Sequence, residues 1–332
     1  MVADTSNAML SPFLARVMPD MEFFALFAGL VGLWLGTEAT IRGAVGITLR
    51  LRVSEFITGV AILSIGTDLP ELTIAVQAAR ETLHAGQASD VVIGTALGSA
   101  LGQIGLILGA TGLTAHLTLS RRLTYQHGGV LLGSLVLLGL FGLDGQVSRT
   151  EGISLVIVYV MYFIFLMTDM MGTRRHSESN EGTKLGNALV LLLIGLLVVT
   201  YSAELTVTSA TRLAKTLNME QSFIAVVILG FGSSLPEVSV SLAAALKRRA
   251  HMSVGNLIGS NVFDTLVPIG VAATIVDVEF DAAMLRFELP FLFALSVVVL
   301  AFFRRARGIQ RLEAAVILGL YIGYVAIKTA SL

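Results

Sequence analysis

Two glutamates, each directly after a proline, are the residues of this sequence best suited to hold a metal ion. Gly66–Glu71 reads G-T-D-L-P-E and Gly232–Glu237 reads G-S-S-L-P-E, each within a long apolar stretch. A proline there removes a backbone hydrogen bond and frees carbonyl groups. A carboxylate costs roughly 2.5–3.5 kcal/mol at membrane depth, so an acid beside the break marks function. Freed carbonyls together with a carboxylate are typical of a cation site at a broken membrane helix.

The two motifs are copies within a duplicated chain. Adding 166 to the number of Glu71 gives Glu237, and the proline and glycine before it shift by the same amount. Further along, Gly94–Gln103 (G-T-A-L-G-S-A-L-G-Q) matches Gly255–Asp264 (G-N-L-I-G-S-N-V-F-D) at an offset of 161. Since 166 is half of the 332 residues, the duplication covers the whole protein.

The second part of each copy supplies further polar groups. Ser260 and Asp264 are four residues apart and share a helix face, as do Ser99 and Gln103. The glycines around them allow close helix packing, and packing alone would also explain the two serines. A packing motif has no use for an acid, so Asp264 is predicted to serve the cation site.

Three more acids leave alternatives open. Asp68 lies three residues before Glu71, on the same face if the turn stays helical, either as a fourth acid of the site or as a solvated residue of the cavity wall. Glu38 and Glu204 occupy matched positions in the first span of each copy. They form either a polar contact between helices or part of an ion pathway.

The five histidines fall in predicted loops or span ends and are interpreted as surface residues: His84, His116, His127, His176 and His251.

The composition is that of a membrane protein. Hydrophobic residues make up 55% of the chain and charged residues only 14%, unlike a soluble domain. The length leaves room for about ten spans of roughly 20 residues. The absence of cysteine excludes a disulfide framework and a thiolate metal site, and a net charge of −1 indicates no nucleic-acid surface.

Ten apolar segments separated by short turns are predicted to cross the membrane. They lie near residues 21–41, 53–79, 89–114, 125–143, 151–171, 186–211, 221–246, 253–276, 285–303 and 311–330. The one sizeable polar interruption, 172–185, is too short for a domain and is expected to be a cytoplasmic linker. It would join a first repeat, 1–171 with motif 66–103, to a second repeat, 186–332 with motif 230–264.

Lysine and arginine are divided unequally between alternate loops. One set of loops carries fifteen and the other seven, and the richer side is cytoplasmic by the positive-inside rule. This places both termini outside. Five spans per repeat is an odd number, so the second copy must insert upside down, with the binding site between the two breaks. The expected fold is an all-α membrane protein of about ten transmembrane helices in two inverted five-helix repeats, with broken helices at the ion site.

These motifs resemble the signature repeats of the cation/calcium exchanger superfamily, which includes Na⁺/Ca²⁺ exchangers. That pattern reads like G-T-S-L-P-E followed by G-N-x-x-G-S-N-x-x-[ND], and the second copy matches it with Ser233 in place of threonine. The resemblance covers nearly the whole chain and implies that Glu71 and Glu237 are the central Ca²⁺ carboxylates. It also implies antiport by alternating access, in which the first span of each repeat slides across a rigid core. The remaining ligands that it implies are backbone carbonyls of Thr67 and Ser233, and Na⁺ or secondary ligands at Ser99, Gln103, Ser234, Ser260 and Asp264.

The first copy departs from the family pattern. Asp68 stands where serine is usual, Thr95 and Ala100 stand where asparagines are usual, and Gln103 replaces another asparagine. One additional acid should change the preferred ion or the coupling ion. Like charges brought together favour protonation of at least one carboxylate, so proton coupling remains open beside sodium coupling.

The sequence therefore predicts a secondary active transporter, a Na⁺/Ca²⁺ antiporter or, as the alternative, an H⁺-coupled cation/Ca²⁺ antiporter. We expect no enzyme and no cofactor, with Ca²⁺ and Na⁺ (or H⁺) as transported ions. The expected partners are the lipid bilayer and inorganic cations, without nucleic acid or an obligate protein partner, in a prokaryotic cytoplasmic (inner) membrane. An intramembrane hydrolase using Asp68 or Asp264 is disfavoured because H-E-x-x-H, nucleophile-elbow and paired G-x-G-D motifs are absent. A channel is disfavoured because an internal inverted repeat favours alternating access.

Overall fold

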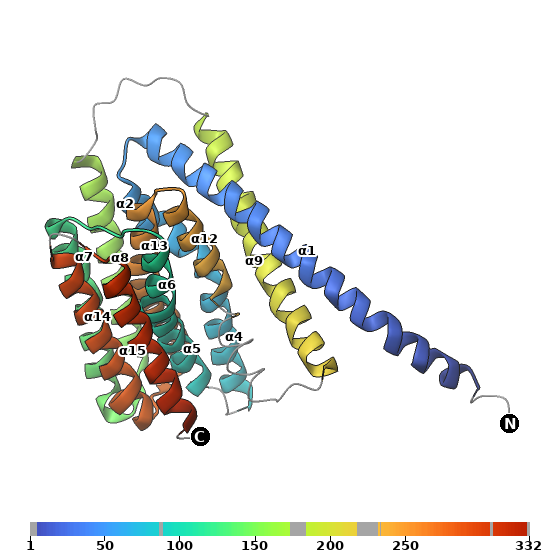
Figure 1. Cartoon of the computed structure of the whole chain (residues 1–332). Coiled ribbons are helices and arrows are strands. Elements are labelled where there is room, and N and C mark those ends of the chain that lie inside the picture. The colour runs from blue at the N-terminus through green and yellow to red at the C-terminus, as the bar shows by residue number, and fades with distance from the viewer. Residues whose placement is uncertain are drawn as a thin grey trace.

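In the computed structural model the chain forms a bundle of helices (Figure 1). The structure describes residues 5–85, 89–172, 184–217, 232, 234–305 and 308–330. Helices of the first half are α1 (Thr5–Leu51), α2 (Glu55–Thr58), η1 (Gly59–Leu63), α3 (Ser64–Thr67), α4 (Leu69–Ala85), α5 (Ser89–Leu101), η2 (Gly102–Ile107), α6 (Leu108–Thr114), α7 (Arg121–Phe141), η3 (Gly142–Asp144) and α8 (Arg149–Gly172). Those of the second half are α9 (Leu185–Thr216), α12 (Leu235–Leu246), α13 (Ala250–Ile275), η5 (Met284–Glu288), α14 (Leu289–Arg304) and α15 (Arg311–Ala330).

The described helices account for most of the predicted spans. Within the described residues, eight helices are long and apolar enough to cross a membrane, and the bent segment 55–83 makes a ninth. Of the remaining prediction, 221–246, the structure describes Gly232 and the part from Ser234 onward, where α12 is a shorter apolar helix. Most of the predicted linker 172–185 lies outside the described residues. The ten-span count and the repeat boundaries therefore stay predictions.

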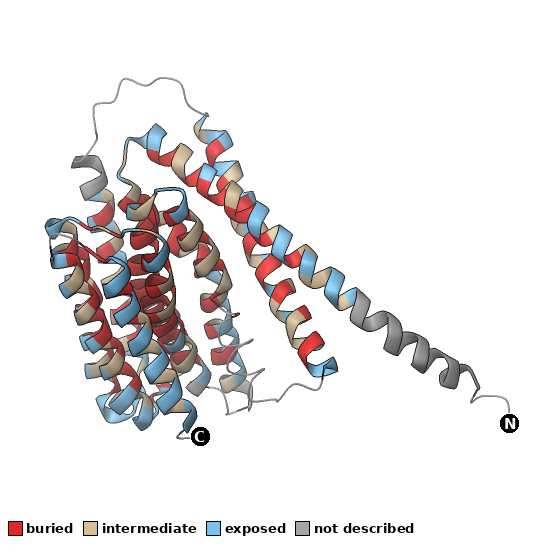
Figure 2. Cartoon of the chain, in the orientation of Figure 1, coloured by how far each residue is buried: buried red, intermediate tan, exposed pale blue. Residues whose placement is uncertain are grey.

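The surface and the interior are distributed as in a protein surrounded by lipid. Phe24, Trp34 and Leu312 are between 68% and 75% exposed, whereas many serines, threonines, amides and acids are buried. Figure 2 shows the buried residues concentrated in the central helices and the exposed ones on the outer helices. Apolar side chains outside and polar side chains inside are the arrangement that a bilayer favours.

Helix α13 forms the centre of the core. It packs against α4, α5, α7, α8, α12 and the α2–η1 segment, and every residue from Met252 to Gly270 is buried. Glycine makes this packing close: a Cβ atom at Gly255 would collide with the carbonyl oxygen of Phe56, and one at Gly259 would lie 2.8 Å from Val60 Cα. The two backbones therefore meet directly, which brings the first half of the chain against the second.

Helices α1 and α9, the first spans of the two predicted repeats, lie side by side on one flank (Figure 1). Glycines again line the contact, with Gly29 against Thr206 and Gly36 against Val199. The two helices pack on each other more extensively than either packs on the core. They form a paired unit that rests on the core through α12 and the α2 region.

Two short backbone pairings join loops of the two halves. Strand β1 (Gln146–Val147) pairs antiparallel with β2 (Val278–Glu279), and an isolated bridge joins Leu117 to Ile309. The strand pair and this bridge are the only β pairings among the described residues. Since Leu117 precedes α7 and β1 follows it, the two pairings lie at opposite ends of that helix.

Candidate cation site

Glu71 and Glu237 occupy equivalent places in the first turns of α4 and α12. In the first copy the helical pieces on either side of Asp68 are bent by 42°, and in the second copy α12 begins after a turn at Ser234. Each proline lies in the first turn of the new helix, where its missing N–H leaves no hydrogen bond unmade. The partial positive charge of the helix N-terminus favours a carboxylate at this position.

Asp68, Glu71 and Glu237 converge on one buried point. One carboxylate oxygen from each lies within 4.8 Å of the others. Within the described chain, Asp68 Oδ2, Glu71 Oε2 and both oxygens of Glu237 have no hydrogen-bond partner. None of the ion pairs found among the described residues involves these three acids. Buried carboxylates in this situation need a cation or protons to offset their charge, so the three form a candidate cation site.

Asp264 reaches the site from α13 and is held by an amide network. Its Oδ2 accepts a hydrogen bond from Gln103 Nε2 (3.0 Å), which also donates to Ser99 Oγ (3.0 Å). Gln103 Oε1 in turn accepts from Asn261 Nδ2 (2.7 Å). Asp264 Oδ1 is buried without a partner among the described residues. The network joins the α5–η2 segment to α13.

Two of the other predicted site residues, Ser260 and Thr67, contact Asp68. Ser260 Oγ donates to Asp68 Oδ1 (2.8 Å). Thr67 Oγ1 donates to Leu63 O (3.1 Å) at the end of η1 and lies 3.2 Å from Asp68 Oδ1. Ser234 is buried at the turn before α12, whereas Ser233 lies outside the described residues. Asp68 is thus part of the acid cluster, and the cavity-wall alternative is not supported.

The backbone is irregular at the two matched positions Gln103 and Asp264. Gln103 lies in the π-helical turn η2, where Leu108 N–H bonds to Gln103 O five residues back. Pro268 lies within α13 and has no N–H for the carbonyl of Asp264, four residues before it. Such local loosening of a helix is common at functional sites.

Asn261 is a site residue that the sequence reasoning does not single out. It is fully buried and donates from Nδ2 both to Gln103 Oε1 and to Leu257 O (3.0 Å). The available signal was an amide within a long apolar helix, since such a group needs a partner inside the protein. Asn256, also in α13, likewise donates to Ser241 Oγ (2.9 Å).

The prediction that all histidines are surface residues is wrong for His127. This residue is buried, with Nδ1 2.9 Å from Tyr162 Oη and its ring 4.7 Å from that of Phe56. The reason is that α7 begins at Arg121 rather than near residue 125, which places His127 in the second turn instead of at the end. Of the others, His116 and His251 are exposed, and the side chains of His84 and His176 lie outside the described residues.

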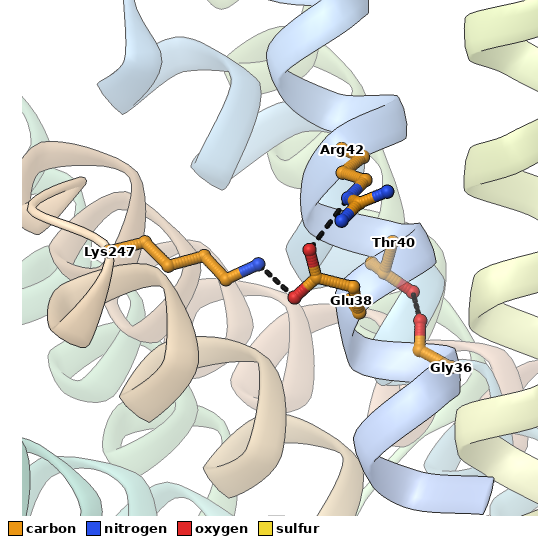
Figure 3. Close-up of polar contacts among 5 residues, drawn as sticks. All are labelled: Gly36, Glu38, Thr40, Arg42 and Lys247. Carbon is orange, nitrogen blue, oxygen red and sulfur yellow. Dashed lines mark hydrogen bonds and ion pairs between the residues drawn. The ribbon is translucent and has the colours of Figure 1, made fainter.

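Glu38 forms ion pairs at the junction of α1 and the core (Figure 3). It accepts from Arg42 Nε (2.6 Å), one turn further along α1, and contacts Lys247 Nζ at the C-terminal end of α12. This supports the interpretation as a polar contact between helices over that of an ion pathway. Its matched residue Glu204 is exposed on α9.

Membrane-spanning helices around buried, unpaired acids define a multi-pass integral membrane protein of the ion-transporting class. A family model described as "Sodium/calcium exchanger protein" matches residues 21–168 and 187–330. The chain belongs to this sodium/calcium exchanger family.

Individual relatives agree with the family assignment. An uncharacterized membrane protein of Methanocaldococcus jannaschii is 30% identical over 294 residues, which cover 89% of this chain and 93% of that protein. The sodium/calcium exchanger MaX1 of Methanosarcina acetivorans is 26% identical over 351 residues, covering 93% and 99% of the two chains. Among solved structures, the sodium–calcium exchanger NCX_Mj superposes with a TM-score of 0.79 at 29% identity, covering 92% of this chain and 98% of that one. The chain is therefore a cation/calcium antiporter of the Na⁺/Ca²⁺ exchanger type with prokaryotic relatives, and its family consists of transporters, not enzymes.

Proposed function

We propose that the protein exchanges Ca²⁺, or a divalent cation of similar size, for Na⁺ by alternating access. Asp68, Glu71 and Glu237 hold the divalent cation, and Asp264 contributes its free oxygen at the edge of the site. The observation that carries the proposal is the convergence of three buried carboxylates, drawn from both halves of the chain, to within 4.8 Å.

The spacing of the acids suits calcium. Ca²⁺ takes oxygen ligands at about 2.3–2.6 Å, so two ligands on opposite sides of the ion lie roughly 4.6–5.2 Å apart. Carboxylate oxygens within 4.8 Å of one another can therefore contact one ion with little rearrangement. Calcium is also coordinated by six to eight oxygen ligands. Backbone carbonyls near the helix breaks, as at Thr67 and Ser233, would supplement the carboxylates.

The architecture completes the proposal. Residues 1–171 and 186–332 act as inverted repeats, joined by the cytoplasmic linker 172–185, in a prokaryotic cytoplasmic membrane with both termini outside. The pair α1–α9 moves across the core to open the site to each side in turn. This movement is supported by the extensive contact of α1 with α9 and the smaller contact of either helix with the core.

Transport in proteoliposomes tests the proposal. We expect an outward Na⁺ gradient to drive ⁴⁵Ca²⁺ uptake, because Na⁺ leaving down its gradient is exchanged for Ca²⁺. Glu71→Gln should abolish uptake, since it removes a charged ligand and keeps the size of the side chain. Glu81→Gln, an exposed glutamate on the same helix α4, is the matched control and should transport normally. A rate of ⁴⁵Ca²⁺ uptake that is the same with and without the Na⁺ gradient would contradict sodium coupling.

The additional acid Asp68 supports one alternative, exchange of Ca²⁺ for H⁺. Four carboxylates can together carry more negative charge than one divalent ion neutralises, and protons would balance the remainder. In the same vesicles, uptake driven by a pH gradient with Na⁺ absent would establish this alternative. Exchange of Asp68 for serine, the residue usual in the family pattern, should then restore dependence on Na⁺.

A further inference from the structure

Gln103 stands among the predicted ligands, yet its amide is already fully engaged. Both N–H groups donate, one to Ser99 Oγ and one to Asp264 Oδ2, at 3.0 Å each. The carbonyl oxygen accepts from Asn261 at 2.7 Å. The side chain is completely buried, so water cannot replace any of these partners.

The orientation of this amide follows from its neighbours. Asn261 donates its second N–H to the carbonyl of Leu257, which can only accept. Its nitrogen therefore faces both Leu257 O and Gln103 Oε1. An ionised Asp264 also only accepts, so the nitrogen of Gln103 must face it. The carbonyl oxygen of Gln103, the one atom that could bind a cation, is directed toward Asn261 and away from the acids.

A cation is thereby excluded from the space between Ser99 and Asp264. Two N–H groups carrying partial positive charge occupy that space, and they take one oxygen from each residue. Among the described residues, the partnerless carboxylate oxygens of this region are on Asp68, Glu71 and Glu237, together with Oδ1 of Asp264. The π-helical turn that contains Gln103 and the tight contact of Gly105 with Tyr321 of α15 fix the position of the amide.

We infer that Gln103 is a positioning residue that holds Asp264 Oδ2 and Ser99 Oγ away from the cation and confines the divalent ion to Asp68, Glu71, Glu237 and the remaining oxygen of Asp264. It thereby sets the number of monovalent cations that the site accepts. This inference rests on the proposed function and assigns the chemistry within the same site.

The test uses Ca²⁺/Ca²⁺ exchange in proteoliposomes, because that reaction needs no coupling ion, with added Na⁺ as a competitor. Gln103→Met keeps the volume of the side chain and removes all three hydrogen bonds. The freed oxygens of Asp264 and Ser99 then offer a new monovalent position. We expect the Hill coefficient of Na⁺ inhibition to rise by about one. The half-saturating Ca²⁺ concentration should shift about tenfold, the effect of losing one hydrogen bond to a charged group.

Asn261→Leu supplies a second variant, because the Asn261 side chain donates its hydrogen bonds to Gln103 Oε1 and Leu257 O and not to a carboxylate. It removes the donor that holds Gln103 and should change Na⁺ inhibition in the same direction but less. The two changes together should equal Gln103→Met alone, because both act through one network. Gln103→Asn retains an amide and should lie closer to wild type. Gln126→Met, the same substitution on α7 beside Arg122, is the matched control.

The outcomes separate the inference from the function on which it rests. Wild-type protein without Ca²⁺/Ca²⁺ exchange would overturn the proposed function. A second outcome is that the wild type exchanges normally, whereas Gln103→Met is as inactive as Glu71→Gln and still runs as a monodisperse protein on size exclusion. That outcome would make Gln103 a ligand and overturn the inference. Unchanged cooperativity of Na⁺ inhibition in Gln103→Met would overturn it as well.

Discussion

At the scale of single residues, the negative charge of Glu237 is the hardest to accommodate in the protein without a cation. Both its carboxylate oxygens are buried without a partner among the described residues. Glu237→Gln removes that charge at almost constant volume. We expect Ca²⁺ transport to fall by about 100-fold or more, which corresponds to roughly 3 kcal/mol, the upper range for a contact to a charged group. The cation-free protein should become more stable, because two neighbouring acids lose a like charge.

Thermal unfolding with and without CaCl₂ checks this prediction. A ligand that binds only the folded state stabilises it, so Ca²⁺ should raise the melting temperature of the wild type and leave that of Glu237→Gln unchanged. Exposed Glu81 again provides the control, as Glu81→Gln should behave like the wild type. A variant still stabilised by Ca²⁺ would show that Glu237 is not a ligand.

At the scale of elements, the ion pair between Glu38 and Lys247 tests whether α1 slides on the core. The chain has no cysteine, so the double variant Glu38→Cys/Lys247→Cys can be joined by a short bismaleimide at this pair alone. We expect the cross-link to reduce exchange to the background of empty liposomes, because α1 is then fixed to α12. The double variant without the cross-link should retain exchange, since a partly exposed ion pair contributes only about 0–1 kcal/mol to stability.

A matched cross-link within the α1–α9 pair gives the contrast. Arg212 on α9 lies 3.2 Å from Glu22 on α1, so Glu22→Cys/Arg212→Cys joins two helices that are proposed to move together. Exchange should survive this cross-link. Equal loss of exchange in both double variants would show that α1 and α9 do not move as one unit.

The crossing of α13 with the α2–η1 segment makes a separate prediction about folding. A Cβ atom at Gly259 would lie 2.7–2.9 Å from atoms of Ser64 and Val60, two of them backbone atoms that cannot rotate away. We expect Gly259→Ala to cost about 1–3 kcal/mol and to reduce the yield of monodisperse protein on size exclusion. Gly133→Ala on α7, with open space around its Cβ position, should be neutral or slightly stabilising. Equal yields would mean that the crossing can separate without loss of the fold.

At the scale of the whole molecule, the sequence predicted what depends on strong and local signals. Apolar runs gave the positions of the spans, because the bilayer forces each run into a helix. Buried acids at matched positions indicated Glu71 and Glu237, since charge in a membrane is costly. The prediction of a broken helix is confirmed at Asp68, where the bend is 42°.

What the sequence could not supply depends on contacts between distant residues. Gln103 and Asn261 are 158 positions apart, and nothing local shows that their amides bond to each other. Because the sequence does not show that contact, it leads to the interpretation of Gln103 as a cation ligand. His127 was misplaced for a local reason, since a helix start four residues earlier than predicted moves it from the surface into the interior.

The two backbone pairings bear on the inverted arrangement of the repeats. Leu117 pairs with Ile309, and Val147 pairs with Val278. The motif offset of 161 carries Leu117 to Val278, and it carries Val147 to position 308, next to Ile309. Each pairing is therefore approximately the image of the other, at the opposite end of α7. That relation is expected if the second copy is inverted in the membrane.

Labelling of single cysteines from outside the cell tests this arrangement and its orientation. Asp144 and Arg121 are exposed at opposite ends of α7, and the cysteine-free chain allows one label at a time. Because the loops richer in lysine and arginine face the cytoplasm, Asp144→Cys should react with a membrane-impermeant maleimide in intact cells. Arg121→Cys should react only after permeabilisation. The reverse labelling pattern would show the opposite orientation in the membrane, with both termini inside. Labelling of both sites in intact cells would contradict the assignment of α7 as a membrane span.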